Sequence, residues 1–430
     1  MNENAVRSAI QEAIRSTPVV DPHCHLDPGH PGSRSFDDIL LYHHVWIELV
    51  SCGLPQKEVT AAGLPQELVD PGMDPLERIR RARPYFHAIR NTVSSLFLRW
   101  LLRDLFEWEE DLEVSDPRKL QERMDGMLSR GGWAEKVFQR CRIERCISVE
   151  KGGNEGTPRI LKGAETLGIV NLVDGKRSAR ETLASKDAEL GREIRTAGDY
   201  REYLVRKLDV VPPESLRFLG AWVAPSITDE LATDEEVTRI LGRARDGRAL
   251  SQEETGSFCY FGLCAGLDHL KKSRLRTIQV IVGAEVLPPH RSIPQWDGRF
   301  TAALARIAGA YEEFRFNVST ASEHYLQDIA ILAKHLPNIS VAGYWWHTLY
   351  PNYIRLALET RLDIVPANKI VAFFSDAYHC EWIYPKLRLV ESILEDILVQ
   401  RVMQDRYSLP TATSLVPTLL HDAPTDIYLR

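Results

Sequence analysis

The fold of this chain is decided by a short stretch near its amino terminus, Val19-Val20-Asp21-Pro22-His23-Cys24-His25-Leu26-Asp27. Its apolar start predicts a buried strand, and side chains along a strand alternate between the two faces. His23 and His25 therefore share one face at the carboxyl end of the strand, where both imidazoles can reach one ion. Neutral imidazole is a ligand of zinc and of other divalent first-row metals. The alternative interpretation is a coincidental pair of histidines in a solvated loop.

An amphipathic helix is predicted before this strand. Val6, Ile10 and Ile14 recur at helical spacing, and Pro18 cannot continue the hydrogen-bond ladder of a helix. The segment is charged and has no apolar core, so it is unlike a signal peptide. The sequence also contains no run of about 20 apolar residues. We therefore expect a cytoplasmic protein that makes no contact with a membrane.

The composition is typical of a globular protein and excludes several classes of function. A net charge of -7 over 430 residues gives no electrostatic argument for binding nucleic acid or an anionic membrane. The substrate is therefore expected to be a small molecule. Seven cysteines are an odd number and widely scattered, which indicates a reducing compartment. No Cys-x-x-Cys occurs, so a cysteine-only zinc site has no support.

Alternation of strands and helices predicts an α/β fold, a (β/α)8 TIM barrel. Residues 36–130, after a loop rich in Gly and Pro over 27–35, have a helical pattern with no clear strand, which predicts a helical insertion after the first strand. Further buried strands are predicted at Ile143–Val149, Gly168–Val173, Leu216–Val223, Thr277–Ala284, Phe314–Val318, Ile339–Tyr344 and Ile370–Ser375. Strands that alternate with helices pair in parallel through right-handed crossovers. We therefore expect residues 1–430 to form one barrel domain.

In such a barrel, residues just past the carboxyl ends of different strands meet at one site. Asp376 follows the last predicted strand, so it can complete the metal shell with His23 and His25 and act as a general base. The alternative role for Asp376 is to cap the next helix. Glu150 and Lys151 follow an earlier strand, and the sequence does not decide whether they reach the site.

The helical insertion supplies a second group of candidates. Tyr42, His43 and His44 lie close in sequence to the first strand and its loop. We expect Tyr42 or His43 to take part in proton transfer and His44 to contact the substrate. The alternative interpretation is that both histidines belong to the polar surface of a helix.

The last third of the chain supplies the remaining candidates. His347 follows Trp345-Trp346 near the end of a predicted strand, and all three are expected to bind substrate. Hydrogen bonding of His347 within the barrel rim is the alternative. Tyr378 lies beside Asp376, where it can contact the substrate, orient the base or cap the following helix.

Several of these motifs together resemble the amidohydrolase superfamily, in particular its uronate isomerase branch. The similarity rests on His23-Cys24-His25, Ser375-Asp376 and Trp345-Trp346, and it extends to the insertion with Tyr42-His43-His44. The resemblance implies a distorted (β/α)8 barrel with one divalent metal, usually zinc, on the two histidines and the last aspartate. It also implies glucuronate isomerase activity, in which a hexuronate changes between aldose and ketose by proton transfer between adjacent carbons.

Three positions depart from the pattern of those isomerases. Tyr378 stands where they carry an arginine, Ile281 stands where they carry a histidine, and Val223–Ser226 lacks their arginine-proline-aspartate turn. Arginine binds a carboxylate with a planar fork, and neither tyrosine nor valine can replace its charge.

Three functional hypotheses remain open from the sequence. The first is metal-assisted isomerisation of a sugar acid or similar small polar carbonyl compound. The second is metal-water hydrolysis of an amide, ester or lactone, or a decarboxylation, with Asp376 as base. The third is a barrel that has lost catalysis and keeps a structural or ligand-binding role. Assembly as a homo-oligomer is also expected.

Overall fold

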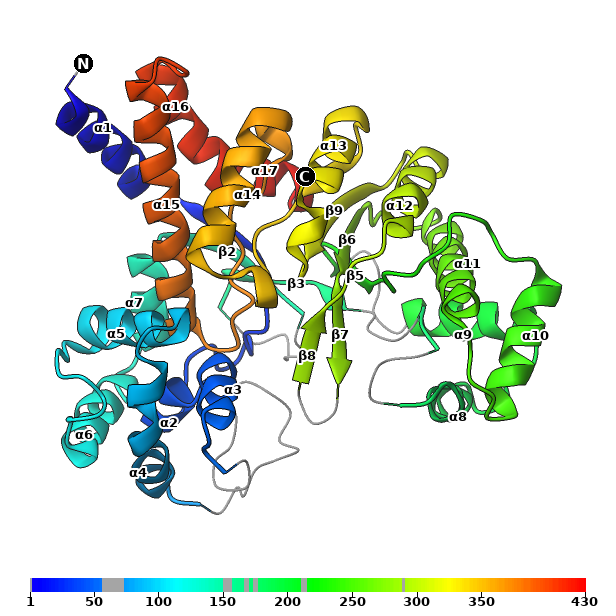
Figure 1. The fold of residues 1–430 in the computed structure, drawn as a ribbon, viewed down its shortest axis with the longest axis horizontal. Helices are drawn as coiled ribbons and strands as arrows, with labels where there is room; N and C mark the ends of the chain where they lie inside the picture. Colours follow the sequence, from blue (N-terminus) through cyan, green and yellow to red (C-terminus); the bar gives the residue numbers. More distant parts are fainter. Residues whose placement is uncertain are drawn as a thin grey trace. The chain divides into compact units, whose positions relative to one another are not determined.

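The computed structural model describes residues 2–55, 73–149, 157–165, 170–172, 177–209, 215–287 and 291–430 (Figure 1). The chain forms two compact units. Unit 1 comprises Met1–Arg15, Leu161–Phe373 and Ile397–Arg430, and unit 2 comprises Ser16–Ile160 and Phe374–Asp396. The interpretation of residues 1–430 as one barrel domain stays a prediction.

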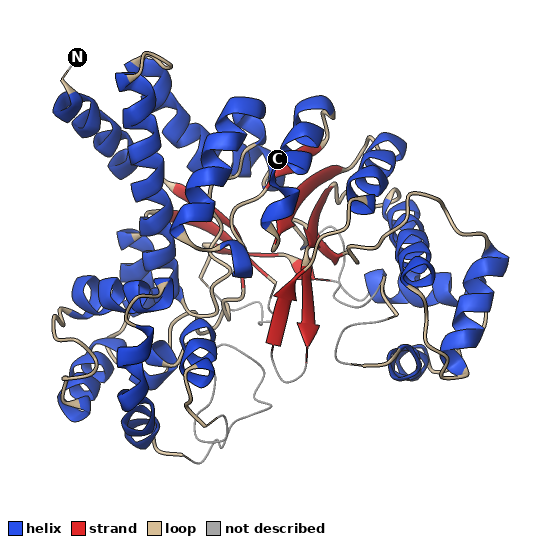
Figure 2. Ribbon diagram, in the orientation of Figure 1, coloured by secondary structure: helices blue, strands red, loops and turns tan. Residues whose placement is uncertain are grey.

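Unit 2 combines two parallel strands with a group of helices (Figure 2). Strand β1 (Val19–Cys24) pairs with β2 (Ile143–Ser148), and Asp21 lies opposite Cys146. The helices between them are α2 (Phe36–Leu40), α3 (His43–Ser51), α4 (Pro75–Phe86), α5 (Val93–Phe106), α6 (Pro117–Leu128) and α7 (Trp133–Arg140). The described part of residues 36–130 is therefore helical, as predicted.

Local sequence signals fix the starts of these helices. The Asp74 carboxylate accepts a hydrogen bond from the Glu77 N–H at 3.0 Å before α4, and the Thr92 hydroxyl accepts one from the Ser95 N–H at 3.2 Å before α5. Each cap satisfies an N–H group that has no partner within the helix and contributes about 1 kcal/mol. The apolar stripes of α4 and α5 are buried within unit 2.

Unit 1 is built around a five-stranded parallel sheet with the strand order β10-β9-β6-β5-β4. Its strands are β4 (Ala164–Glu165), β5 (Leu219–Trp222), β6 (Thr277–Val282), β9 (Arg315–Thr320) and β10 (Ile339–Val341). Parallel pairing brings the carboxyl ends of these strands to one edge of the sheet. Four strands predicted between residues 216 and 344 are confirmed, with ends that differ by a few residues.

Unit 1 also contains helices (Figure 2). They are α1 (Glu3–Ser16), α8 (Ala179–Leu190), α9 (Ala197–Asp209), α10 (Asp234–Arg245), α11 (Gln252–Leu270), α12 (Arg299–Ala310), α13 (Leu326–His335), α14 (Pro351–Ile364), α16 (Leu409–Pro417) and α17 (Ala423–Tyr428). Helix α15 (Ile383–Met403) begins in unit 2 and ends in unit 1, and β3 (Ile160–Lys162) also spans the boundary. An antiparallel hairpin of β7 (Ala284–Leu287) and β8 (Arg291–Pro294) follows β6. Helix α1 buries Val6, Ile10 and Ile14, which confirms the predicted amphipathic helix.

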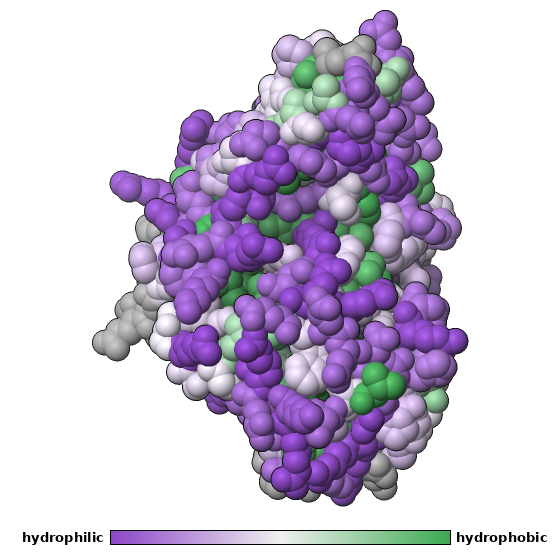
Figure 3. Space-filling view, turned by 90° about the vertical axis from the view of Figure 1, so that its left-hand side faces the viewer, coloured by the Kyte–Doolittle hydropathy of each residue, from purple (hydrophilic) through white to green (hydrophobic). Residues whose placement is uncertain are grey.

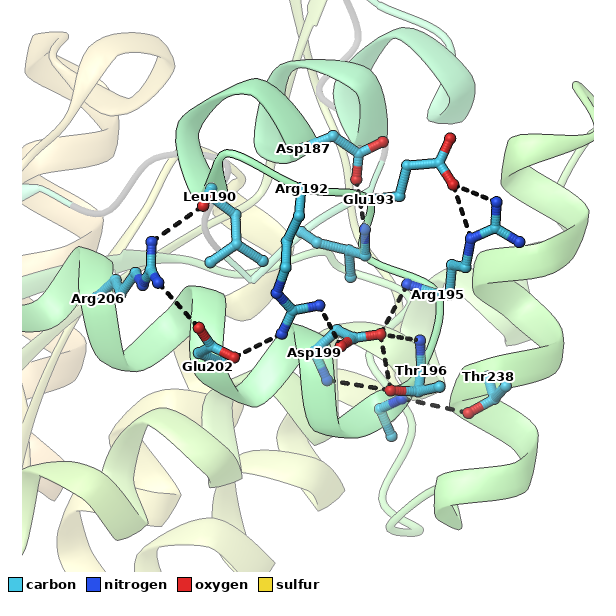
Figure 4. A network of polar contacts seen from close by, with 12 residues as sticks. Asp187, Leu190, Arg192, Glu193, Arg195, Thr196, Asp199, Glu202, Arg206 and Thr238 are labelled. Carbon is cyan, nitrogen blue, oxygen red and sulfur yellow. Dashed lines mark hydrogen bonds and ion pairs between the residues drawn. The ribbon is translucent and has the colours of Figure 1, made fainter.

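An exposed network of ion pairs joins the end of α8 to α9 in unit 1 (Figure 4). Arg192 pairs with Asp199 and with Glu202, and both Arg192 and Glu202 keep more than 40% of their side-chain surface in solvent. Asp199 also accepts hydrogen bonds from the Thr196 N–H at 2.9 Å and from the Thr196 hydroxyl at 2.8 Å. The network therefore caps the start of α9 while it remains in contact with water.

The strand predicted at Ile370–Ser375 is not formed. Ile370 makes an isolated bridge to β10, and no strand is assigned to the residues that follow. The physical reason is that its hydrogen bonds do not follow one neighbouring strand. The Val371 N–H donates to the Val341 carbonyl at 2.9 Å, the Ala372 N–H donates to the Leu419 carbonyl at 3.1 Å, and the Ser375 N–H donates to the Asp21 carboxylate at 2.9 Å. The segment before Asp376 is buried, as predicted, but its hydrogen-bond partners are two separate backbone carbonyls and one side chain.

One face of the molecule is largely polar (Figure 3), and the cysteines are unpaired. In the described part of the chain, no helix combines the length and apolarity that crossing a bilayer requires. The face shown in Figure 3 is mostly hydrophilic, with hydrophobic residues in small separate groups. All seven cysteines are free thiols.

Two sequence predictions fall largely outside the described residues. Glu150 and Lys151, which follow β2, are not among them. The strand predicted at Gly168–Val173 is described only over residues 170–172. The roles of Glu150 and Lys151 therefore stay open.

Candidate metal centre

The two histidines end a strand that is buried along its whole length. The His23 side chain is 2% exposed and that of His25 is 12% exposed. Their ring centroids lie 5.3 Å apart at an interplanar angle of 79°, so neither ring stacks on the other. Both rings therefore present a nitrogen to the same place, as residues two apart on a strand are expected to do.

Asp376 belongs to the second chain segment of unit 2, and its carboxylate lies against the two histidines. Its Oδ1 lies 3.4 Å from His23 Nε2 and 3.3 Å from His25 Nε2. All three candidate ligand atoms lie within 4.8 Å of one another. Ligands at about 2.0–2.1 Å from a tetrahedral zinc ion lie roughly 3.3–3.4 Å apart, so the two distances from Asp376 to the histidines fit such an ion. Two nitrogens and one oxygen also leave a position open for substrate.

The electrostatic environment keeps Asp376 ionised. Burial acts to raise the pKa of this carboxyl, but hydrogen bonds and charge interactions with His23 and His25 lower the pKa well below its usual range. The carboxylate is therefore available as an anionic ligand at neutral pH. This group of three residues can hold a divalent metal ion.

The backbone holds Asp376 in an unusual conformation. Its φ is +49°, in the left-handed region that costs a non-glycine residue about 1 kcal/mol or more. Two main-chain hydrogen bonds keep this turn beside β1: the Asp376 N–H donates to the His23 carbonyl at 2.9 Å, and the His25 N–H donates to the Ala377 carbonyl at 2.8 Å. The three candidate ligands are therefore tied to one another through their own backbones.

Two buried charged residues that the sequence analysis did not select lie next to this turn. Asp21 Oδ1 accepts the Ser375 N–H at 2.9 Å, and Lys386 Nζ donates to the Ser375 carbonyl at 2.7 Å and to the Asp376 carbonyl at 3.3 Å. Burial raises the pKa of Asp21 to about 6 and lowers the pKa of Lys386 to about 8. Asp21 could have been found, because it is two residues before His23 and shares its face. Lys386 gave no such signal, because the sequence does not distinguish it from a surface lysine on a long helix.

Tyr42 is completely buried and bonds to the backbone around Asp376. Its hydroxyl donates to the Asp376 carbonyl at 3.4 Å and accepts from the Tyr378 N–H at 3.2 Å. Its ring stacks on Trp382, with centroids 4.2 Å apart. Burial raises the pKa of Tyr42 well above its usual range, so the hydroxyl stays protonated. These contacts favour a positioning role over proton transfer.

His43 has a buried nitrogen, Nδ1, that makes no hydrogen bond to the described residues. Burial is the main cause that lowers the pKa of His43 well below its usual range, so the ring is neutral at pH 7. The His43 ring lies 5.3 Å from the Tyr378 ring and 4.1 Å from the His44 ring.

Tyr378 stacks directly on one of the candidate metal ligands. Its ring centroid lies 4.3 Å from that of His25, and the two planes differ by only 4°. The Tyr42 ring lies 6.5 Å from Tyr378 and 5.6 Å from His44. The structure therefore brings four sequence candidates, Tyr42, His43, His44 and Tyr378, together in the unit that contains the His-His-Asp group.

Three further candidates form an aromatic group in unit 1, past the end of β10. Trp345 packs edge-on against Trp222 at the end of β5, with centroids 5.0 Å apart. Trp346 has a φ of +45° and stacks on His347 at 5.0 Å. Burial lowers the pKa of His347, which is therefore neutral at pH 7. The expected roles of these residues in substrate binding stay predictions.

Glu381 anchors the loop between β1 and α2. Its carboxylate accepts the Ser33 N–H and the Ser33 hydroxyl, each at 3.2 Å, and the Trp133 indole N–H at 2.7 Å. Gly32 lies directly against it, because an added Cβ would come within 3.2 Å of a Glu381 oxygen. The role of Glu381 is therefore to fix the loop that leaves the candidate metal centre.

The sequence of the chain is similar to uronate isomerases. It is 22% identical over 373 residues to the uronate isomerase of Nostoc punctiforme, a match that covers 78% of this chain and 76% of that protein. A shorter match, 25% identical over 145 residues, is to the uronate isomerase of Phenylobacterium zucineum. No protein-family model matches the chain.

Solved structures extend this similarity to the fold. The uronate isomerase of Thermotoga maritima has a TM-score of 0.81 at 16% identity, over 100% of this chain and 99% of that chain. The glucuronate isomerase of Caulobacter crescentus has a TM-score of 0.82 at 18% identity, over 99% and 94%. A Lactobacillus casei protein proposed to be a metal-dependent hydrolase has a TM-score of 0.58 at 13% identity, over 98% and 97%. The predicted fold class, a distorted (β/α)8 barrel of the uronate isomerase type, is confirmed.

Proposed function

We propose that this homologue of the uronate isomerases, within the amidohydrolase superfamily, is a metal-dependent enzyme that interconverts the aldose and ketose forms of a sugar acid or a similar small polar carbonyl compound. The observation that carries the proposal is the convergence of His23, His25 and Asp376 within 4.8 Å. It occurs in a chain of which 78% matches a uronate isomerase. The donor set and the sequence similarity support the same reaction class.

His23, His25 and Asp376 are the proposed ligands of the ion, and zinc is the proposed ion. Two imidazoles and one carboxylate are a donor set typical of catalytic zinc, which keeps a position open for substrate. When bound, the ion supplies a Lewis acid that polarises the substrate oxygens. Manganese or another divalent ion can use the same donors, so metal analysis of the purified protein tests this assignment.

The reaction moves protons and needs no oxidant. One proton leaves the hydroxyl-bearing carbon and one is added to the neighbouring carbonyl carbon, while a hydroxyl proton moves between the two oxygens. His43 is the proposed carrier of the carbon-bound proton, because its neutral ring has a buried Nδ1 without a hydrogen-bond partner in the described residues. Asp376 is proposed to take the hydroxyl proton, and its own backbone bonds hold it in place.

The remaining candidates are proposed to orient the reacting groups and the substrate. Tyr42 holds the Asp376 backbone through its hydroxyl. Tyr378 covers one face of His25 and limits how that ring can rotate. Substrate binding is proposed for His44, Tyr378 and the aromatic group of Trp345, Trp346 and His347.

Isotope exchange tests the proposed reaction. The zinc-loaded full chain is incubated with glucuronate and galacturonate in deuterated water and followed by NMR. We expect a ketose product and deuterium on the carbon next to the carbonyl, and neither with the His25→Ala variant. Failure to form ketose or to exchange deuterium with any uronate or neutral aldose would overturn the proposal.

Hydrolysis is the second candidate function, and one observation favours it. The residue stacked on His25 is the uncharged Tyr378, which supplies no cation for a substrate carboxylate. A panel of N-acyl compounds, esters and lactones, assayed with the same zinc-loaded protein, separates the two functions. Hydrolysis without any ketose product would support the second candidate.

Location and assembly complete the proposal. A cytoplasmic location is proposed because all seven cysteines are free thiols. A homo-oligomer is also proposed. Cell fractionation tests the location, and light scattering of the purified full chain tests the assembly.

A further inference from the structure

We infer that Asp21 and Lys386 act together as a charged clamp that positions Asp376 for metal binding. The clamp is defined here as these two side chains and the residue that they hold, Ser375. The inference rests on the proposed metal centre and assigns to it two positioning residues outside the ligand set.

The clamp holds one residue from both sides. The Asp21 carboxylate accepts the N–H of Ser375 at 2.9 Å, and the Lys386 ammonium donates to the carbonyl of Ser375 at 2.7 Å. Lys386 also donates to the carbonyl of Asp376 at 3.3 Å. The main-chain N–H and the main-chain carbonyl of Ser375 are therefore both bound by charged side chains. Charge-assisted hydrogen bonds are stronger than neutral ones.

Both charges are completely shielded from water. Asp21 and Lys386 each have 0% of their surface exposed. Burial of a charge is unfavourable unless hydrogen bonds compensate for it. The two acceptors of Lys386 are backbone carbonyl oxygens, and its ammonium lies 5.5 Å from the centre of the Tyr42 ring. Neutral, apolar side chains would fill the positions of Asp21 and Lys386 at a lower free-energy cost of burial. Packing alone therefore does not explain why charged residues occupy these positions.

The backbone conformation of Asp376, the residue after Ser375, explains why charged residues are kept here. Asp376 has a φ of +49°, a left-handed conformation that costs a non-glycine residue free energy and persists where the surroundings hold it. The clamp fixes the preceding residue and the Asp376 carbonyl, so it determines the direction of the carboxylate. Asp21 is also hydrogen-bonded through its Oδ1 to the His23 N–H at 3.5 Å, which links the clamp to a second ligand. Without the clamp, Asp376 keeps its backbone bond to β1 and its bond to the Tyr42 hydroxyl, but the direction of its carboxylate toward the histidines is less firmly fixed.

Zinc affinity tests the inference, measured by competition with a chromophoric chelator. The Lys386→Met variant keeps the length of the side chain and removes its charge and donors. Residues that support metal ligands typically contribute 10–100-fold to metal affinity, and we expect a loss of that size. The visible spectrum of the cobalt-substituted variant should also change, because the ligand geometry changes. Lys386→Gln keeps N–H donors without the charge, so its affinity should be intermediate.

A matched control is available in unit 1. Lys186 is also a buried lysine, 4% exposed, and its ammonium lies 5.0 Å from the centre of the Tyr203 ring. Lys186→Met should reduce thermal stability while zinc affinity and the cobalt spectrum stay as in the wild type. A loss of zinc affinity in both methionine variants would show a general effect of removing a buried charge, and would overturn the clamp.

A double-mutant cycle tests whether the two charges act as one device. Asp21→Asn and Lys386→Met affect the same residue, so their combined loss of zinc affinity should be smaller than the product of the single losses. If the loss of zinc affinity in the double variant equals the product of the two single losses, the clamp is overturned. Where Lys386→Met does not fold, as judged by circular dichroism, the cycle is measured with Lys386→Gln.

The outcomes separate this inference from the proposed function. Wild-type protein that binds zinc, with a Lys386→Met variant of equal affinity and an identical cobalt spectrum, overturns the clamp and leaves the proposed function standing. Folded wild-type protein that binds no zinc overturns the proposed metal centre itself. In that case the clamp falls with it.

Discussion

The exposed ion-pair network of unit 1 and the buried charged group of unit 2 differ in their number of charges and in their exposure to water. The network between α8 and α9 in unit 1 contains many ion pairs, and its Arg192 and Glu202 are 44% and 42% exposed (Figure 4). The group around Ser375 in unit 2 contains few charges. There the side chains of His23 and Asp376 are 2% and 10% exposed.

The difference shows that the number of polar contacts is a poor guide to function. Exposed ion pairs are screened by water and salt, so each contributes little to stability. Buried charges are unfavourable unless every one is well bonded, so a chain that keeps them at one place uses them to fix a geometry. We therefore expect substitutions to have large effects in the buried group and small effects in the exposed network.

The largest effect is expected at the candidate ligands. His25→Ala and Asp376→Asn each remove one of three donors, so the chain should lose its bound ion and at least about 10²–10⁴-fold of its activity. Metal analysis and the isotope-exchange assay measure these losses. His335→Ala, at the exposed end of α13, is the matched control and should keep one ion per chain. If His25→Ala binds as much metal as the wild type, the expected difference between the buried group and the exposed network is not present.

Glu381→Gln is expected to lower the stability of the fold without acting directly on the catalysed reaction. The Glu381 carboxylate accepts three donors, from Ser33 and Trp133, so Glu381→Gln places an amide N–H against groups that also donate. The cost should be about 1–3 kcal/mol, visible as a lower melting temperature of the apoprotein. An unchanged melting temperature would show that the loop does not depend on this carboxylate.

A smaller effect is expected at Tyr42. Tyr42→Phe removes the hydroxyl that bonds the Asp376 carbonyl and the Tyr378 N–H, at a cost of about 1 kcal/mol for each bond. Because we assign a positioning role to this residue, kcat should fall by less than about 10-fold. A fall of about 10²–10⁴-fold would identify Tyr42 as a proton carrier instead.

The smallest effect is expected in the exposed network, and it depends on pH. The hydrogen bond from Arg192 is the main cause that lowers the pKa of Asp199. A lowered pKa in the folded state adds stability above the pKa of the unfolded chain, about 4, and this stability is lost as the pH falls through the folded pKa. Asp199→Asn should therefore change the melting temperature by no more than about 2 °C at pH 7, and by less at pH 3 or in 1 M salt. A large change in melting temperature that does not depend on salt would contradict the expectation that the exposed network contributes little to stability.

Local sequence patterns were sufficient to predict most of the fold. Short apolar runs located β1, β2, β5, β6, β9 and β10, and helical spacing located α1. The segment before Asp376 was wrongly predicted as a strand, because its apolar sequence shows that it is buried but not where its hydrogen bonds go. That information lies in Asp21, whose carboxylate replaces a strand as the acceptor for Ser375.

The candidate centre was predictable in part for the same reason. His23 and His25 are two residues apart, so their common face follows from strand geometry. The meeting of Asp376 with them depends on tertiary structure, and the sequence predicted it only through the expected barrel. Lys386 could not be selected, because an isolated lysine in a helix usually lies at the surface, and only the structure shows that it is buried against two carbonyl oxygens.

The way unit 2 is assembled from two distant segments affects how the protein is made. Asp21 and Ser375 are 354 residues apart in the chain. At about 5–20 residues per second, a ribosome needs on the order of tens of seconds between completing the first and the second. During that interval the histidine pair has left the ribosome without its carboxylate partner. The nascent chain therefore cannot complete this centre during most of its synthesis, and the last step must follow the emergence of helix α15.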